Sequence, residues 1–305
     1  MTLGYQGELY ILAFDHRGSF QKKFFGIAGE PTPEESNRIS DAKTVIYEGL
    51  LRAVQDGAAK EAAGLLVDEQ FGADIVRKGK AEGIKTAMPV EKSGQNEFDF
   101  QYGEDFGKHI EEFDPDFSKV LVRYNPKGDP GMNRRQTERL KRLGGWLHEH
   151  DRKFLFELLV PAEQSQLDRV GGDVGRYDRE VRPELMQRAI ADLQDQGVEA
   201  DIWKIEGIDD RAACERIAQQ VRSGGRDQVV CVMLGRGADD AAVAHWLKTG
   251  AGVPGYVGFA IGRTIWWDAL KAYVDKESDR GKAAEIISER YRHMIDVYRS
   301  AAKPA

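Results

Sequence analysis

The sequence predicts a single (βα)8 barrel (TIM barrel), an α/β fold, on the basis of three observations. Short apolar runs of strand length recur eight times along the 305 residues. Amphipathic stretches separate them, with apolar residues returning at intervals of three and four, as in helices that face a sheet. The first run is followed by FDHRGSF and not by a glycine-rich phosphate loop. A doubly wound open sheet is the alternative, because alternation alone does not prove that a sheet closes.

The eight apolar runs have the length, the β-branched or aromatic content and the flanking turn residues of buried strands. In order along the chain they are ELYILAFDH (8–16), GLLVDEQF (64–71), TAMPVE (86–91), SKVLVRYN (118–125), KFLFELLV (153–160), DIWKIEG (201–207), QVVCVMLG (228–235) and GYVGFAIG (255–262).

Amphipathic helices are expected between these strands. The clearest cover residues 41–61, 134–151, 182–197 and 209–224, and a further helical stretch, SDRGKAAEIISERYRHMIDVYRS, ends the chain. No linker or convincing repeat divides the sequence. We therefore expect one barrel domain over residues 1–305 with a C-terminal helix.

Composition argues against several classes of protein. A net charge of -7 gives no reason to expect a nucleic-acid partner. Two cysteines, Cys214 and Cys231, are too few for a disulfide framework and fit a reducing compartment. The N-terminal sequence lacks the pattern of a signal peptide, and no apolar run approaches the roughly 18 residues of a membrane span. We expect a cytoplasmic protein without a membrane partner.

Ionisable residues recur on the inward faces of several expected strands. Side chains alternate between the two faces of a barrel strand, and active sites lie at the C-terminal strand ends. The shared faces are Asp15 and Arg17 with Ala13, Lys119 and Arg123 with Leu121 and Asn125, Glu157 with Leu155 and Leu159, and Lys204 with Ile202 and Glu206. One buried charge has no functional meaning by itself, but this recurrence indicates a site.

Lys204 has two interpretations, because lysine is rarely buried unless it is paired or used. It could form an internal salt bridge with Glu157 or Glu206. Alternatively, it is a Schiff-base nucleophile. An unperturbed lysine, with a pKa of about 10.4, offers little free amine at neutral pH, but burial near another cation releases more. Lys119 is the candidate for that cation, and Glu157 for the acid and base that moves the carbinolamine protons.

Glycine–arginine pairs end the last two strands. LGRG (234–237) contains Gly235 and Arg236, and IGR (261–263) contains Gly262 and Arg263. Loops after strands seven and eight of a barrel often bind phosphate through backbone N–H groups, to which arginine adds charge-assisted contacts. The alternative is a pair of tight turns with solvated arginines.

Three further observations are weaker. Asp68 and Glu69 could bind hydroxyls or a metal, or face solvent, and Glu91 and Lys92 could form an ion pair at the rim. Of the six histidines only His16 falls at a strand end. A zinc site with several histidine ligands therefore finds little support, and we expect neither a metal nor a cofactor.

These residues occur in longer motifs that resemble a known protein family. The motifs are AFDHRGSF, LLVDEQFG, MPVEKSGQNEFDFQYGEDF, KVLVRYNPKGD, KFLFELLVP, DIWKIEG, MLGRGADD and GFAIGRTIWWDAL. Together they resemble the aldolase-like domain fused C-terminally to the kinase in bacterial 5-dehydro-2-deoxygluconokinase proteins of inositol catabolism. The resemblance runs from about residue 6 to the last helix, and 305 residues leave no room for the kinase.

The chain is more distantly similar to class I tagatose-1,6-bisphosphate aldolases and sulfofructose-phosphate aldolases, which are (βα)8 barrels. That resemblance implies a Schiff-base role for Lys204, whose motif continues with Ile205 and Glu206. The other residues matching family positions are Glu157, Lys119, Asp15 and Arg17, with Gly235, Arg236, Gly262 and Arg263 in the phosphate-binding regions. Two departures, LGRG after strand seven and Arg123 where an aromatic residue is common, put the substrate in doubt.

The resemblance implies a class I, metal-independent aldolase, a lyase that acts on a phosphorylated keto-sugar. The implied substrate, 6-phospho-5-dehydro-2-deoxy-D-gluconate, would give dihydroxyacetone phosphate and malonate semialdehyde. Lys204 would attack the ketone, Glu157 with Lys119 and Asp15 would move protons, and Arg123 or Arg17 would hold the substrate carboxylate.

Several alternatives stay open at this stage. The first is a tagatose-bisphosphate-like or sulfo-sugar phosphate aldolase, or a transaldolase. The second is a non-catalytic barrel that binds sugar phosphates. Asp68 is a further candidate for substrate binding, and a homo-oligomer is plausible.

Overall fold

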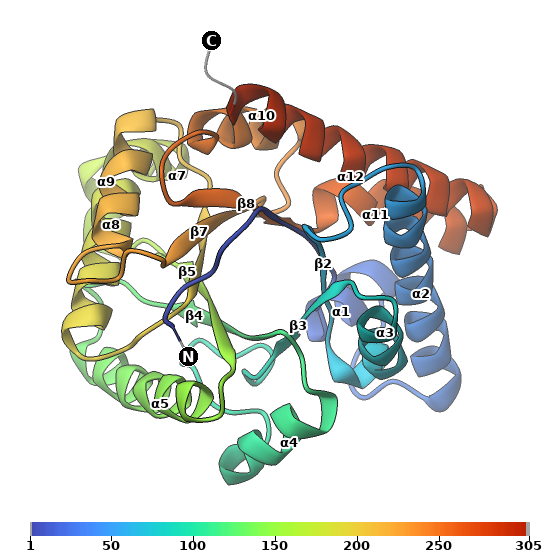
Figure 1. Ribbon diagram of the computed structural model, residues 1–305, viewed down its shortest axis with the longest axis horizontal. Coiled ribbons are helices and arrows are strands. Elements are labelled where there is room, and N and C mark those ends of the chain that lie inside the picture. Colours follow the sequence, from blue (N-terminus) through green and yellow to red (C-terminus); the bar gives the residue numbers. More distant parts are fainter. Residues whose placement is uncertain (1, 303–305) are drawn as a thin grey trace.

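The computed structural model describes residues 2–302, and within them eight parallel strands close a barrel in the order of the sequence (Figure 1). The strands are β1 (Leu9–Ala13), β2 (Ala63–Leu66), β3 (Lys85–Pro89), β4 (Phe117–Arg123), β5 (Lys153–Leu159), β6 (Ile202–Glu206), β7 (Val230–Leu234) and β8 (Tyr256–Ile261). The pairing of β1 with β8, with Leu9 opposite Gly258, closes the ring. The predicted (βα)8 barrel is confirmed, and the open sheet is excluded.

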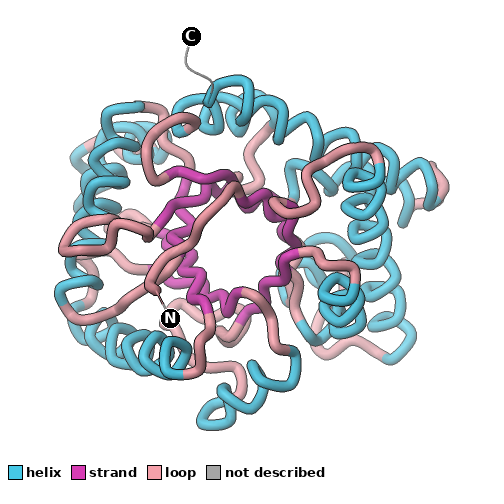
Figure 2. The backbone as a smooth tube through the Cα atoms, in the orientation of Figure 1, coloured by secondary structure: helices cyan, strands magenta, loops and turns pink. Residues whose placement is uncertain are grey.

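Helices surround the barrel, as the tube drawing in Figure 2 shows. They are α1 (Gly18–Phe25), α2 (Pro33–Gln55), α3 (Glu69–Ala81), α4 (Phe106–Phe113), α5 (Pro130–Glu149), α6 (Gln164–Arg169), α7 (Val174–Arg176), α8 (Arg182–Asp195), α9 (Arg211–Val221), α10 (Asp240–Gly250), α11 (Arg263–Val274) and α12 (Arg280–Ala302), with the short turns η1 (Gly103–Asp105) and η2 (Tyr177–Val181). The C-terminal helix α12 packs against α2, α10 and α11. Among the residues described, no helix is both long and apolar enough to span a bilayer.

Side-chain caps fix where several helices begin. Thr32 and Glu35 form a reciprocal capping box at the start of α2. Asp129 and Asp239 accept backbone N–H groups at the starts of α5 and α10. Each such cap stabilises its helix by about 1 kcal/mol. Since α5 follows β4 and α10 follows β7, their caps also fix loops that surround the barrel mouth.

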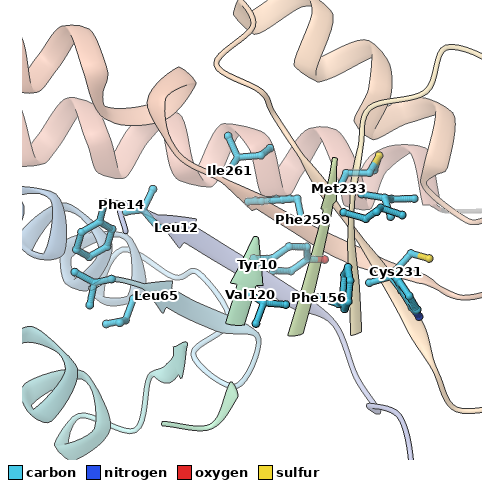
Figure 3. Packing of buried hydrophobic residues seen from close by; sticks show 14 of the residues in the cluster. Tyr10, Leu12, Phe14, Leu65, Val120, Phe156, Cys231, Met233, Phe259 and Ile261 are labelled. Atoms are coloured by element: carbon cyan, nitrogen blue, oxygen red, sulfur yellow. The ribbon is translucent and has the colours of Figure 1, made fainter. Parts of the chain in front are cut away.

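Two apolar layers position the functional side chains. Outward residues such as Tyr10, Phe156 and Phe259 pack between the barrel and the helices (Figure 3). Inward residues fill the lower part of the barrel, including Phe117, Leu155 and Ile202. Because inward positions return every second residue, the next inward side chains along these strands are Lys119, Glu157 and Lys204. A layer of charge therefore lies directly above the apolar interior.

The N-terminal segment, residues 4–7, closes the opposite end of the barrel. The Gly4 amide donates to Asp201 Oδ1 at 2.7 Å, and the Tyr5 amide donates to the Gln228 carbonyl at 2.9 Å. The Tyr5 ring meets the Phe117 ring edge-on, with centroids 5.5 Å apart. Gly4 has φ of 106°, and a Cβ there would lie 2.0 Å from the Gln228 carbonyl oxygen, so this approach needs glycine. In Figure 2 this segment crosses the barrel opening.

A buried ion pair, Lys43 of α2 with Asp68 before α3, connects two helices beside the mouth. Both side chains are fully buried and in direct contact. The Lys43 ammonium also donates to the carbonyls of Phe14 at 2.9 Å and His16 at 3.1 Å. The pair therefore holds the end of β1, from which Asp15 and Arg17 extend.

We expect Lys43→Met to lower the free energy of unfolding by about 3–5 kcal/mol, because it leaves the Asp68 carboxylate buried without its counter-charge. Urea denaturation measures the loss. The double variant Lys43→Met/Asp68→Asn should recover part of it, whereas the exposed Lys248→Met should change stability by less than about 0.5 kcal/mol. If Lys43→Met were as stable as Lys248→Met, the Lys43–Asp68 ion pair would contribute nothing to the free energy of unfolding.

Candidate active site

Lys119 on β4 lies at the centre of the charged layer. Its ammonium is 2.8 Å from Asp15 Oδ2, 2.8 Å from Glu91 Oε1 and 3.1 Å from Glu157 Oε2. Only 1% of the residue is exposed. Burial opposes the charge, but the attraction of Asp15, Glu157 and Glu91 is larger and raises the pKa of Lys119 well above its ordinary value. Lys119 is thus held as a cation among three carboxyl groups.

Lys204 on β6 joins the same cluster through Glu157. Its Nζ donates to Glu157 Oε2 at 2.9 Å, so one carboxylate oxygen serves both lysines. Glu157 and Lys204 are direct neighbours in the register of β5 and β6. Burial favours protonation of Glu157, but Lys119 and then Lys204 outweigh it and hold the pKa of Glu157 below its ordinary value. The carboxylate is therefore ionised and can accept a proton.

Asp15, at the end of β1, is the second ionised carboxylate. Burial opposes its charge, but the attraction of Lys119 and Lys204 holds the pKa of Asp15 far below its ordinary value. The structure therefore brings Lys204, Glu157, Lys119 and Asp15 into one hydrogen-bonded group. Their catalytic roles stay predictions at this point.

Of the two salt bridges considered for Lys204, the structure contains the one with Glu157. The other candidate partner, Glu206, pairs with different residues. The Glu206 Oε1 atom forms ion pairs with the guanidinium groups of Arg182, at 2.7 Å, and Arg236, at 3.1 Å. Its second oxygen accepts the Val160 amide at 3.0 Å. Glu206 therefore ties β6 to β5 and to the loops around it.

Glu91, after β3, belongs to the central cluster, and its predicted rim pairing with Lys92 is wrong. Only 8% of Glu91 is exposed, and its partners are Lys119 and Arg17. Its position at the C-terminal end of a barrel strand was the available signal. The sequence did not reveal the partner of Glu91, because Lys92 is its neighbour along the chain whereas Lys119 lies on the adjacent strand β4.

A cavity of about 620 Å³ opens above this cluster, with Asp15, Glu91, Lys119, Glu157 and Lys204 in its lining. Five cationic residues surround them: Arg17, Lys22, Lys23, Lys92 and Arg123. The arginines are held by backbone carbonyls, Arg17 by that of Glu91 at 2.5 Å and Arg123 by that of Gln95 at 2.9 Å. This excess of positive charge favours a ligand with more than one anionic group.

Arg263, at the start of α11, lines a second cavity of about 700 Å³ together with residues 237–241. Lys23 lines both cavities, so they adjoin. Gly262 allows the turn before α11 to approach β1, because a Cβ there would lie 2.2 Å from the Ala13 carbonyl oxygen. Gly235 packs against Ile261, because a Cβ at Gly235 would lie 3.2 Å from the Ile261 Cγ2 atom. These two glycines shape the turns and line neither cavity.

Arg236 and Asp68 are placed differently from the predicted ligand contacts. Arg236 has φ of 52° and is engaged by Asp178 at 2.7 Å and Glu206 at 3.1 Å. Asp68 is 0% exposed, with one oxygen capping α3 at the Phe71 amide and the other bound to Lys43. Neither residue lines either of the two cavities described above, and neighbouring side chains compensate the charge of each. For Asp68, the alternative that its side chain faces solvent is wrong.

His16 lines the first cavity and faces Trp266 edge-on. Burial lowers the pKa of His16 to about 4, with Arg263, Lys43 and Lys204 acting in the same direction and Asp15 opposing them. The imidazole is therefore neutral at pH 7 and offers a hydrogen-bonding ring beside Asp15. Within residues 2–302 no cluster of three or more histidine, cysteine or acidic side chains has the geometry to hold a metal ion.

Known proteins similar to this chain include aldolases. A family model described as an uncharacterized protein conserved in bacteria (DUF2090) matches residues 4–302. Tagatose 1,6-diphosphate aldolase 1 of Streptococcus pyogenes serotype M3 is 20% identical over 303 residues, covering 92% of this chain and 87% of that protein. The serotype M6 protein matches equally well. The predicted similarity to tagatose-1,6-bisphosphate aldolases is thus confirmed as distant homology.

Solved structures share the barrel at lower identity. Fructose-bisphosphate aldolase from Plasmodium falciparum is 16% identical with a TM-score of 0.68, covering 98% of this chain and 93% of that one. An archaeal fructose 1,6-bisphosphate aldolase is 16% identical with a TM-score of 0.60, covering 96% of this chain and 94% of that one. At such identity these likenesses show the fold alone.

Proposed function

This chain belongs to the DUF2090 family, and we propose that it is a class I aldolase that cleaves a phosphorylated keto-sugar acid. The observation that carries the proposal is the pairing of two buried lysines on one ionised carboxylate. Lys204 and Lys119 both meet Glu157 Oε2, at 2.9 and 3.1 Å, in the lining of a cationic cavity at the barrel mouth. Aldolase-like homology and fold agree with it.

Lys204 is the proposed nucleophile. Its neutral amine attacks the substrate ketone to give a carbinolamine, which loses water to form an iminium ion. Glu157, 2.9 Å from Lys204 Nζ, first takes a proton from the ammonium and gives it to the ketone oxygen as the amine attacks. It then takes a second proton from the carbinolamine nitrogen and gives it to the hydroxyl, which leaves as water. The iminium keeps its positive charge where the ammonium was, beside the same carboxylate. The charge balance of the cluster is therefore preserved.

Carbon–carbon cleavage then uses the iminium as an electron sink. A carboxylate, Glu157 or Asp15, takes the proton of the hydroxyl on the carbon that becomes the aldehyde. The bond electrons move into an enamine, which is protonated at carbon, and water hydrolyses the resulting iminium. Lys119 keeps both carboxylates ionised through contacts of 2.8 and 3.1 Å, and so keeps them competent as bases.

The cations that line the first cavity outnumber its carboxylates and support a substrate with anionic groups. Arg263 and the backbone of residues 237–241 are the proposed phosphate contacts, because they line the cavity that adjoins the catalytic one. Arg17 or Arg123 is the proposed carboxylate contact in the first cavity. Together with the motif resemblance, this favours 6-phospho-5-dehydro-2-deoxy-D-gluconate and a place in inositol catabolism.

Product identification tests the proposal. We expect the protein to convert 6-phospho-5-dehydro-2-deoxy-D-gluconate to dihydroxyacetone phosphate and malonate semialdehyde at least about tenfold more efficiently, in kcat/KM, than tagatose 1,6-bisphosphate or a sulfo-sugar phosphate. Mass spectrometry of the products measures the outcome. Preference for another substrate would reassign the aldolase. Transfer of the three-carbon unit without its release would identify a transaldolase.

One observation favours a second candidate, a non-catalytic barrel that binds sugar phosphates. The Lys204–Glu157 contact of 2.9 Å is also what a purely structural ion pair requires. That candidate predicts binding of the phosphosugars without turnover and without a covalent adduct. The borohydride experiment described in the Discussion separates the two.

A further inference from the structure

Among residues 2–302, no donor contacts one of the two carboxylate oxygens of Glu91. Its backbone carbonyl accepts Arg17 at 2.5 Å, and its Oε1 accepts Lys119 at 2.8 Å. Its Oε2 is buried and has no hydrogen-bond partner within the described part of the chain. The residue lines the catalytic cavity and is 8% exposed. A buried carboxylate oxygen without a donor is costly if it is charged.

The charges around Glu91 differ from those around the other two carboxylates. Asp15 and Glu157 are attracted by both Lys119 and Lys204, and the pKa of each lies below its ordinary value. Glu91 is attracted by Lys119 and Arg17 and repelled by Asp15, and burial exceeds these effects and raises its pKa. Carboxyl groups that share a site and are driven apart in this way divide into an acid and bases. Glu91 is therefore the most readily protonated carboxyl group of the three.

The position of Glu91 relative to Lys204 specifies which part of a substrate it meets. The contacts run from Lys204 to Glu157 at 2.9 Å, from Glu157 to Lys119 at 3.1 Å, and from Lys119 to Glu91 at 2.8 Å. Glu91 follows β3 and Lys204 lies on β6, three strands apart in the closed ring. Under the proposed function the phosphate lies toward Arg263 and the carboxylate toward Arg17, which contacts the Glu91 carbonyl, so the carbons beyond the enamine lie on the Glu91 side of Lys204.

We propose that Glu91 carries a proton on Oε2 and donates it in a hydrogen bond to the substrate oxygen that becomes the aldehyde oxygen. This role rests on the proposed aldolase function. During cleavage that oxygen loses its own proton to Glu157 or Asp15 and gains negative charge as the carbon–carbon bond weakens. The Glu91 O–H stabilises this charge and keeps its proton throughout. In the condensation direction the same O–H polarises the aldehyde carbonyl.

Two half-reactions separate this role from a merely structural one. Iminium formation and solvent exchange of the α-proton of dihydroxyacetone phosphate involve only the ketone fragment. Carbon–carbon cleavage or condensation also involves the aldehyde oxygen. A residue that serves that oxygen affects the second reaction and spares the first.

The experiment compares Glu91→Ala, Glu91→Gln and the control Glu97→Gln, which changes a glutamate of the same loop that pairs with Arg135 and Arg139 and lines neither cavity. We expect Glu91→Ala to slow cleavage by about 10²-fold and leave adduct formation and α-proton exchange within about threefold. Glu91→Gln supplies an N–H donor at the same place, so it should keep most of the cleavage rate. Glu97→Gln should resemble the unmodified protein.

The pH profile gives a second readout. Lys119, Arg17 and Asp15 are the charged groups that face Glu91. In the unmodified protein cleavage should decline as rising pH removes the Glu91 proton, and Glu91→Gln should abolish that decline. Equal losses in Glu91→Gln and Glu91→Ala, or parallel losses of exchange and cleavage, would overturn the role of Glu91. Failure of the unmodified protein to form any adduct would overturn the aldolase function and this role with it.

Discussion

Lys204→Ala should abolish cleavage, with a loss of more than about 10³-fold, because Lys119, the other lysine of the buried cluster, is held protonated by its carboxylates. The measurement is borohydride reduction in the presence of dihydroxyacetone phosphate, followed by peptide mass spectrometry. The unmodified protein should gain a covalent mass on the peptide that contains Lys204, and the variant should gain none. Folding should survive, because Glu157 keeps its contact with Lys119 at 3.1 Å.

Lys204→Arg is the matched control for charge. It retains a cation beside Glu157 and cannot form an iminium ion, so it should fold normally and be inactive. An adduct of equal yield in Lys204→Ala would show that another lysine reacts, and Lys119 would then be the first position to map. Activity that is sensitive to chelators would indicate a metal mechanism instead.

Glu157→Gln should reduce cleavage by about 10²- to 10⁴-fold, the range for loss of a general acid and base. The amide oxygen can still accept hydrogen bonds from Lys204 and Lys119, but it cannot take a proton. Steady-state kinetics and borohydride trapping on the same sample give the two readouts. Cleavage should fall steeply, while the adduct on Lys204 still accumulates on a slower timescale.

Glu163→Gln provides the control for that substitution. Glu163 lies in the loop after β5, where it caps α6, and it lines neither cavity. Its activity should stay within about threefold of the unmodified protein. Full activity in Glu157→Gln would remove Glu157 from the mechanism and leave Asp15 as the base.

The inward-facing residues of the strands were predictable because side chains alternate strictly between the two faces of a strand. Once Leu155 and Ile202 are assigned to the interior, Glu157 and Lys204 must follow two positions later, and the structure has them there. The same reasoning placed Asp15 and Lys119 in the cluster. Alternation along a strand is a local property, and the sequence contains it directly.

Ion-pair partners were less predictable because they come from distant segments. Asp68 is neutralised by Lys43, which reaches it from a helix 25 residues earlier. Arg236 is held by Asp178, which is 58 residues earlier in the chain. Both residues looked free for a ligand when only their own strand ends were considered. In the folded chain, Lys43 of α2 and Asp178 of η2 pack against these two residues and neutralise their charges.

The closure of the barrel floor by residues 4–7 has an electrostatic consequence. Gly4 and Tyr5 cover the end of the barrel below the apolar side chains Phe117, Leu155 and Ile202, so bulk water is kept from the underside of the charged cluster. The Coulomb energy between charges varies inversely with the effective dielectric constant around them. The seal thus strengthens the attraction of Lys119 for its carboxylates. Residues 4–7 therefore help to set the dielectric environment of charged groups at the other end of the barrel interior.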